Sequence, residues 1–155
     1  MSTAPDSPGA PAPATAGATA VTNLIARYAQ LVDAGDFAGV GDLFADATFT
    51  GSGPSAHGRD AVAAMLRDSV IRYEDGTPRT HHVTSNIAVE VDEEAGTAAA
   101  DSYVTVFQAA PGLPLQPIAA GRYRDRFVRD DGRWRFLERR VHLHLTGDLS
   151  HHLRA

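Results

Sequence analysis

The sequence predicts a single α+β domain in which three N-terminal helices pack on one face of a curved antiparallel sheet. Two observations carry this prediction. Apolar residues recur at helical spacing in the first half of the chain, and alternating patterns typical of long strands fill the second half. Helices followed by a run of strands indicate the α+β class, because the sheet then has one face for the helices to cover.

The N-terminal half contains three helical patterns. Val21, Ile25, Tyr28 and Val32 mark a helix over about residues 19–34, and Gly35 follows it as a stop. Asp36 is placed to cap a short second helix, which a brief strand at 47–50 follows. A third helix is expected over about 61–70, after the glycine-rich loop 51–58.

Four long strands and the short one complete the predicted sheet. The alternating segments cover about 79–91, 97–109, 116–129 and 133–145. The turn 130–132, Asp-Asp-Gly, is the clearest single signal, because glycine at a left-handed position closes a tight hairpin.

Composition sets the limits of the folded domain, which we expect over residues 19–150. Residues 1–18 are almost entirely Ala, Pro, Thr, Ser and Gly, so we predict a disordered tail there. Residues 151–155 are expected to form a short C-terminal tail, with His151 and His152 at a frayed end.

Several classes of chemistry and partner are excluded by composition. The chain has no cysteine and no lysine, so thiol, disulfide and Schiff-base chemistry are impossible on it. A net charge of -5 argues against nucleic-acid binding. No segment has the length of a membrane span or the pattern of a signal peptide, so we expect no membrane partner and a cytoplasmic location.

Asp33 is the first candidate for a functional residue. It lies in the last turn of the first predicted helix, where the negative end of the helix dipole opposes a carboxylate. We therefore expect a raised pKa, which suits a group that exchanges protons. The alternative is a solvated aspartate at a helix end.

His82 is the second candidate, because histidine gains and loses protons near neutral pH. Strand alternation places His82, Thr84 and Asn86 on one face, and Ile87, Val89 and Val91 on the other. Only a bulge near Ser85 would place His82 on the same face as the apolar residues. The alternative is a structural or exposed histidine.

Three segments together resemble the SnoaL-like branch of the nuclear-transport-factor-2-like superfamily, namely YAQLVDAGDFAGVGDLFADATF, THHVTSN and GRYRDRFVRDDGRWRFLERRV. The resemblance covers about residues 20–150. It implies a cone-shaped fold whose sheet and helices enclose a pocket for a small, largely apolar organic substrate. In the scytalone dehydratase and dehydrochlorinase relatives an aspartate late in the first helix pairs with a strand histidine, which implies a catalytic Asp33 and His82. The second histidine of the dehydratase has no counterpart, since its position falls near Phe107.

Other side chains are expected to line the pocket and bind substrate. Asn86 is a candidate to hold a developing oxyanion, and Tyr103 and Tyr123 are candidate hydrogen-bond donors. The full expected set is Tyr28, Asn86, Tyr103, Phe107, Tyr123 and His142.

No metal is expected in the site. His142 and His144 share a strand face at a spacing that suits a metal, but no third ligand is placed by the sequence. The arginines of the last hairpin alternate with acidic residues, which is typical of a solvated sheet face with cross-strand pairs.

The function predicted from these residues is cofactor-free general acid-base catalysis of the lyase, isomerase or cyclase type, on a small apolar oxygenated metabolite such as a polyketide-like intermediate. The alternative is a non-catalytic subunit that binds a small molecule or serves assembly. We also expect a homodimer formed through the open sheet face, because three short helices cannot cover the other side of the long strands.

Overall fold

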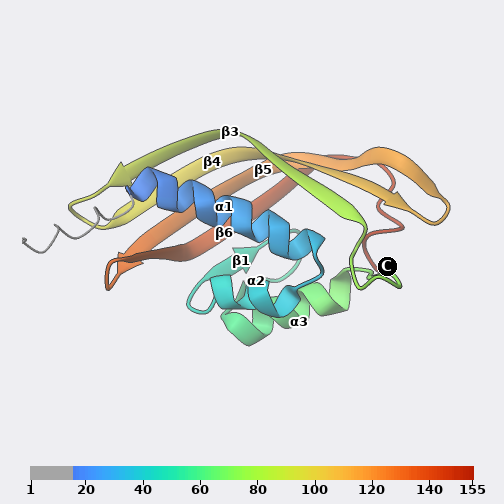
Figure 1. Cartoon of the computed structure of the whole chain (residues 1–155), viewed down its shortest axis with the longest axis horizontal. Helices are drawn as coiled ribbons and strands as arrows, with labels where there is room; N and C mark the ends of the chain where they lie inside the picture. Colours follow the sequence, from blue (N-terminus) through green and yellow to red (C-terminus); the bar gives the residue numbers. More distant parts are fainter. Residues whose placement is uncertain (1–15) are drawn as a thin grey trace, which may run out of the picture.

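The computed structural model describes residues 16–155, and its elements follow the predicted order (Figure 1). The helices are α1 (Gly17–Asp33), α2 (Phe37–Leu43) and α3 (Arg59–Ser69), with the short strands β1 (Thr48–Thr50) and β2 (Ala56–His57) before α3. The long strands are β3 (Thr80–Asp92), β4 (Thr97–Ala110), β5 (Leu113–Asp130) and β6 (Arg133–Thr146). The predicted α+β class is confirmed. Most of the predicted N-terminal tail, residues 1–15, lies outside the described residues.

The six strands form one curved, open sheet in the order β2-β1-β6-β5-β4-β3. All neighbours are antiparallel except β1 and β6, which are parallel. Helix α1 lies across the sheet, where β3 is its main neighbour, and it also contacts α2 and β6, whereas α2 packs against α3 (Figure 1). The two-residue strand β2 is the one element that the sequence pattern did not predict.

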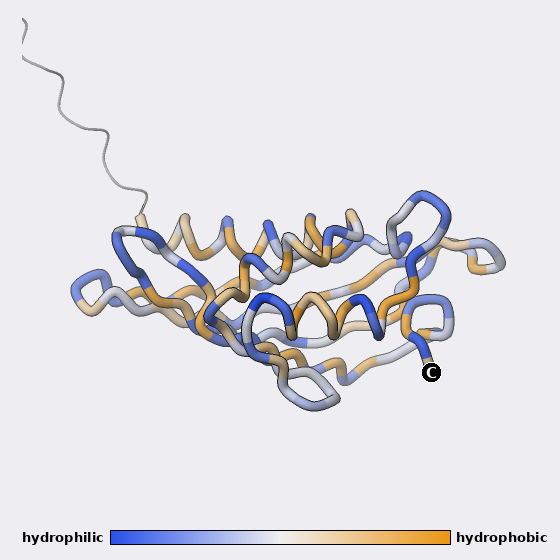
Figure 2. Tube along the Cα trace, turned by 90° about the horizontal axis from the view of Figure 1, so that it is seen from below, coloured by the Kyte–Doolittle hydropathy of each residue, from blue (hydrophilic) through white to orange (hydrophobic). Residues whose placement is uncertain are grey.

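The core lies between the helices and the inner face of the sheet, which we define as the face that α1 covers. Apolar residues recur along α1 and alternate with polar residues along the strands (Figure 2). The buried α1 side chains include Val21, Ile25, Tyr28 and Leu31, as the helical pattern predicted. Alternate residues of β4 and β5 meet them from the sheet.

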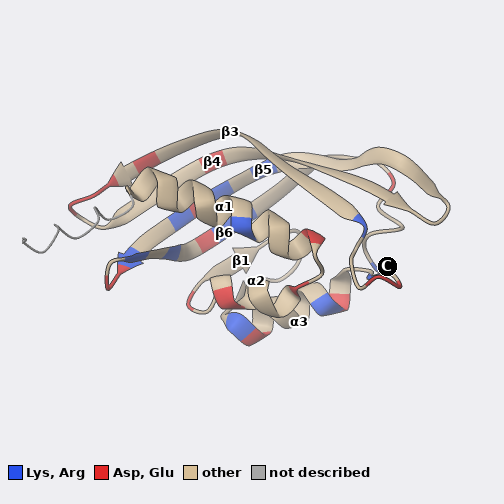
Figure 3. Ribbon diagram, viewed as in Figure 1, with Lys and Arg blue, Asp and Glu red and all other residues tan. Residues whose placement is uncertain are grey.

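The outer face of the sheet, opposite α1, carries most of the charged strand residues. Acidic and basic residues of β3 to β6 are spread along the ribbon of the sheet (Figure 3). Arg124 and Asp101 form one exposed cross-strand pair across β5 and β4, and Arg140 bonds Glu138 on β6. This agrees with the expectation of a solvated face, with the exception of Arg139, described below.

A bulge in β3 sets which of its residues face the core. Pairing with β4 shifts between Ser85 and Ala88, so that two β3 residues stand opposite one residue of β4. Asn86, inside the bulge, has a φ of 52°, a left-handed conformation that asparagine tolerates better than most residues. The extra residue reverses the alternation, and His82 therefore shares the inner face with Val89. Strand alternation in the sequence leaves open whether His82 shares a face with the apolar residues, and the bulge shows that it does.

The hairpin between β5 and β6 closes as predicted. Asp131 and Gly132 have φ values of 50° and 76°, and Asp130 pairs with Arg133 on either side of them. Two central residues with positive φ form the turn type whose twist matches a two-stranded ribbon.

Both ends of the described chain make hydrogen bonds to the rest of the fold that the sequence does not predict. Helix α1 begins at Gly17 rather than near residue 19, and the Gly17 amide donates to Glu93 Oε1 at 2.8 Å. At the other end, the segment after β6 folds back, so that Leu153 pairs with Val70. The interpretation of residues 151–155 as a frayed tail therefore differs from the structure, because backbone hydrogen bonds hold this segment against the end of α3. No helix within residues 16–155 has the length and apolar character needed to cross a membrane.

The close approach of α2 and α3 gives a first testable prediction. A Cβ at Gly41 would lie 2.6 Å from the backbone oxygen of Arg59 and 3.1 Å from Ala63 Cβ. Gly41→Ala is therefore expected to lower the free energy of unfolding by about 1–3 kcal/mol, despite the better helix propensity of alanine. Urea denaturation measures this. Gly53→Ala is the control, since a Cβ there meets nothing within 4 Å. An unchanged or raised midpoint for Gly41→Ala would contradict the close packing.

Candidate functional site

The structure brings Asp33 and His82 into direct contact. Asp33 Oδ1 lies 2.6 Å from Nδ1 of the His82 ring, and Asp33 Oδ2 accepts the His82 backbone N–H at 2.9 Å. The Thr80 hydroxyl donates to Asp33 Oδ1 at 2.9 Å. Three donors thus hold one carboxylate, which fixes the orientation of the imidazole ring.

Two local features bring the pair together. Asp33 is the last residue of α1, and that helix lies against β3. His82 is near the start of β3, and the bulge at Asn86 keeps its side chain on the inner face while the apolar part of the strand also faces the core. The His82 side chain is 8% exposed and that of Asp33 is 22% exposed, so both groups are largely buried.

The pKa of Asp33 corrects one expectation. Burial raises it, but the hydrogen bonds and charge of His82, with the Thr80 hydroxyl, outweigh burial and hold the pKa below its ordinary value. The raised pKa expected from the helix dipole is therefore wrong. Asp33 stays ionised at neutral pH, so it can stabilise a protonated His82 without taking the proton itself.

A buried ion pair lies deeper on the inner face. Arg139 of β6 binds Asp125 of β5 through two parallel hydrogen bonds, of 2.8 and 2.9 Å, and both side chains are 0% exposed. Burial opposes the charge on Arg139, but Asp125 raises its pKa on balance, so the guanidinium stays charged. Nη1 of Arg139 has no hydrogen-bond partner among the described residues.

Two of the predicted pocket residues surround this ion pair. The Arg139 guanidinium lies 4.3 Å from the centre of the Tyr28 ring and 3.7 Å from that of Tyr123. Burial raises the pKa of both tyrosines, and Arg139 opposes that rise. Tyr28 and Tyr123 are therefore buried in the core as neutral, closely packed neighbours of a buried cation.

The other four predicted pocket residues lie elsewhere. Tyr103, 44% exposed, is on the outer face with the Arg122 guanidinium above its ring, and the exposed His142 pairs with Arg122 on the same face. Phe107 is also on the outer face, opposite His81. Asn86 is exposed in the bulge. These expectations are corrected, because strand alternation on β4 and β6 directs the three strand residues away from α1.

The His142 and His144 rings are stacked, with centres 5.9 Å apart. No third histidine, aspartate or glutamate joins them in a group that could hold a metal within residues 16–155. The two rings are better described as part of the exposed end of β6.

Sequence reasoning missed two inner residues. The alternating pattern predicts that Arg139 is solvated like the other arginines of the last hairpin. In the structure Phe127 pairs with Phe136 and Arg126 pairs with Glu138, so β6 has one extra residue between these pairs, and this bulge turns Arg139 inward. His152, assigned to a tail, is 8% exposed with its ring centre 6.4 Å from that of His82. No local pattern signals either position, because a strand bulge decides the first and the docking of the chain end decides the second.

The sequence matches the model of a known protein family. A family model, described as the SnoaL-like domain, matches residues 14–140. The chain belongs to the SnoaL-like family. No curated protein matches the chain.

Several solved structures have a fold similar to that of this chain. A variant of Rv3472 from Mycobacterium tuberculosis, a protein of unknown function, is 27% identical with a TM-score of 0.67, over 81% of this chain and 70% of that chain. A protein of Novosphingobium aromaticivorans, provisionally named a scytalone dehydratase, is 25% identical with a TM-score of 0.68, over 84% and 86%. ActVI-ORFA of Streptomyces coelicolor is 24% identical with a TM-score of 0.66, over 84% and 97%, a likeness that shows the fold alone.

Proposed function

We propose that this SnoaL-like chain is a cofactor-free general acid-base catalyst of the lyase, isomerase or cyclase type, acting on a small, largely apolar, oxygenated molecule. The observation that carries the proposal is the contact between Asp33 and the His82 ring at 2.6 Å. The likeness to a protein provisionally named a scytalone dehydratase supports a reaction of this type.

The roles of the two residues follow from their contact. An ionised Asp33 accepts a hydrogen bond from Nδ1–H of His82, which leaves Nε2 with a lone pair for the ligand. Nε2 removes a proton from a carbon next to a carbonyl, and the electron pair of the broken C–H bond moves toward the carbonyl oxygen. The Asp33 carboxylate stabilises the imidazolium, which then returns the proton to carbon or to a leaving oxygen.

Removal of a proton from such a carbon is the step that lyase, isomerase and cyclase reactions share, and one assay detects it. β-Tetralone is a small, bicyclic, apolar ketone with acidic C–H groups. We expect the protein to accelerate exchange of these hydrogens for deuterium in D₂O, measured by proton NMR, with the acceleration lost in His82→Ala. Binding of β-tetralone with an exchange rate that His82→Ala leaves unchanged would instead support a non-catalytic binding protein.

The outer sheet face is the surface that we propose for a homodimer. Tyr103 and Val83 are 44% and 38% exposed, and Phe107 lies on the same face. An apolar surface of this kind between charged residues is typical of a contact between subunits.

The dimer is a testable prediction. Light scattering at micromolar concentration is expected to give twice the chain mass of 16.4 kDa, and Tyr103→Glu is expected to give the monomer mass. Leu115→Glu is the control, because Leu115 is 73% exposed in another part of the sheet and should leave the dimer intact. A wild-type protein that is monomeric under these conditions would refute the proposal.

A further inference from the structure

The segment that follows β6 is built into the fold beside the candidate site. The Ile71 amide donates to the His152 carbonyl at 2.8 Å, and the Arg154 amide donates to the Ser69 carbonyl at 2.9 Å. Leu149 and Leu153 pack against the hydrophobic core. These contacts place His152 at a fixed position, although it is only three residues from the end of the chain.

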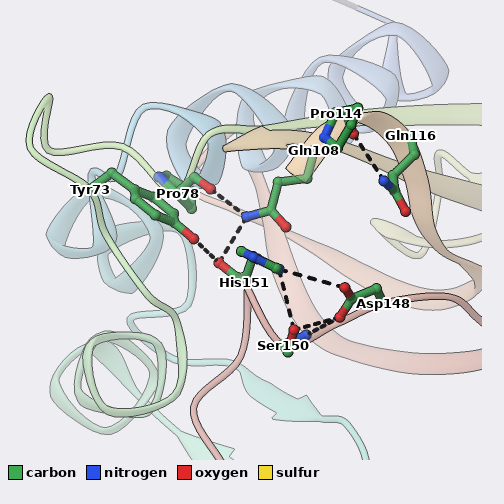
Figure 4. Close-up of polar contacts among 8 residues, drawn as sticks. All are labelled: Tyr73, Pro78, Gln108, Pro114, Gln116, Asp148, Ser150 and His151. Atoms are coloured by element: carbon green, nitrogen blue, oxygen red, sulfur yellow. Dashed lines mark hydrogen bonds and ion pairs between the residues drawn. The ribbon is translucent and has the colours of Figure 1, made fainter. Parts of the chain in front are cut away.

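Side-chain hydrogen bonds fix the same segment from the sheet side (Figure 4). Gln108 Nε2 donates to the carbonyl oxygen of His151 at 2.9 Å and to that of Pro78 at 3.0 Å, and the Tyr73 hydroxyl donates to the same His151 oxygen. Gln108 is 1% exposed, and its own Oε1 has no hydrogen-bond partner among the described residues. A buried amide thus holds the segment at the inner end of β4.

The His152 ring lies beside the His82 ring. The two ring centres are 6.4 Å apart, with the ring planes at 67°. A direct N–H···N hydrogen bond between two imidazoles would bring the ring centres to about 5 Å. At the observed spacing the two rings make no such bond, so neither ring is the hydrogen-bond partner of the other.

The state of His152 suits contact with an oxygen. The residue is 8% exposed, and its Nδ1 has no hydrogen-bond partner within residues 16–155. Burial, and then the neighbouring His82, lower the pKa of His152 to about 4, with Asp33 acting in the opposite direction. The ring is neutral at neutral pH, and an unpartnered polar atom in such surroundings favours a bound polar group.

We propose that His152 is a second imidazole of the active site, whose ring makes a hydrogen bond to the carbonyl oxygen of the substrate while His82 acts on the carbon next to that carbonyl. The proposal rests on the function proposed above and names the group that recognises the substrate's oxygen. The oxygen that His152 binds is thus two bonds from the carbon that loses its proton.

Two ligands that differ only in the ketone oxygen distinguish a hydrogen bond made by His152 from a loss of packing. β-Tetralone carries the ketone oxygen, and tetralin has the same two rings without it. We expect His152→Phe to weaken binding of β-tetralone about tenfold, the amount that one hydrogen bond contributes, and to change tetralin binding less than twofold. His152→Asn, which keeps a polar atom near the Nδ1 position, should restore part of the β-tetralone affinity.

Controls make every outcome informative. His81→Phe is the matched control, because His81 is exposed on the outer face of β3, the strand that carries His82. Equal losses for both ligands in His152→Phe, or a wild-type protein that binds neither, would overturn the proposal. If His152→Phe fails to fold, β-tetralone and tetralin binding are compared in His152→Asn and His152→Gln instead. Equal losses of affinity for the two ligands in these variants would also overturn the proposal. If exchange depends on His82 but the two ligands respond alike, only the role of His152 fails. If the ketone-specific loss appears without His82-dependent exchange, the proposed catalysis fails instead.

Discussion

Replacing His82 with alanine is expected to slow deuterium exchange of β-tetralone by about 10²- to 10⁴-fold, the range that a positioned general base contributes. The fold should survive, because the Asp33 carboxylate keeps its hydrogen bonds from the backbone N–H at position 82 and from the Thr80 hydroxyl. Circular dichroism and urea denaturation check this. His81→Ala is the matched control, because the neighbouring histidine points to the outer face and should leave the exchange rate unchanged.

Asp33→Asn tests the second half of the pair. The amide keeps the shape of the carboxylate but removes its negative charge, so we expect a slower exchange with β-tetralone binding retained.

In the wild-type protein, protonation of Asp33 at low pH should slow the exchange in the same way. The pKa of this carboxylate lies below its ordinary value, so its stabilising contacts are present above the unfolded pKa and are lost as pH falls through the folded one. Rates in Asp33→Asn equal to those of the wild type at neutral pH would show that the carboxylate has no catalytic role.

Removal of Asp125 is expected to give the largest loss of stability. Asp125→Ala leaves the Arg139 charge without its two hydrogen bonds at a position with no exposure to solvent. We expect the free energy of unfolding to fall by about 3–5 kcal/mol, because an uncompensated buried charge is costly. Urea denaturation monitored by tryptophan fluorescence measures it.

Two comparisons show whether the buried charge causes this loss. Replacing both partners with apolar residues, in Asp125→Leu with Arg139→Met, should recover a substantial part of the stability, because no charge is then left unpaired. Glu138→Gln, which removes an acidic partner of the exposed Arg140, should change stability by about 0.5 kcal/mol or less. A loss in Asp125→Ala no greater than that in Glu138→Gln would contradict a structural role for the pair.

Strand bulges decide the faces of two residues, His82, which the sequence leaves open, and Arg139, which it misassigns. Alternation predicts which face a strand residue occupies only until a bulge adds one residue and reverses the pattern. The bulge at Asn86 placed His82 on the inner face, and the bulge near Phe136 turned Arg139 inward among arginines that face solvent. Tyr103 and Phe107, on a strand with regular alternation, were misassigned because no sequence signal stated which of its faces meets α1.

The sequence by itself determined the α+β class, the order of the helices and long strands, the Asp131-Gly132 hairpin and the two residues of the proposed catalytic pair. These depend on local periodicity, turn residues and resemblance, all of which a single chain displays in its sequence. Only the tertiary structure decided that Asp33 and His82 touch, that Arg139 is buried against Asp125 and that His152 reaches the site. The first and third contacts join segments far apart in the chain, and the second depends on a bulge within the β5–β6 hairpin. Strand register and the docking of the last residues decide them, and neighbouring residues do not encode either.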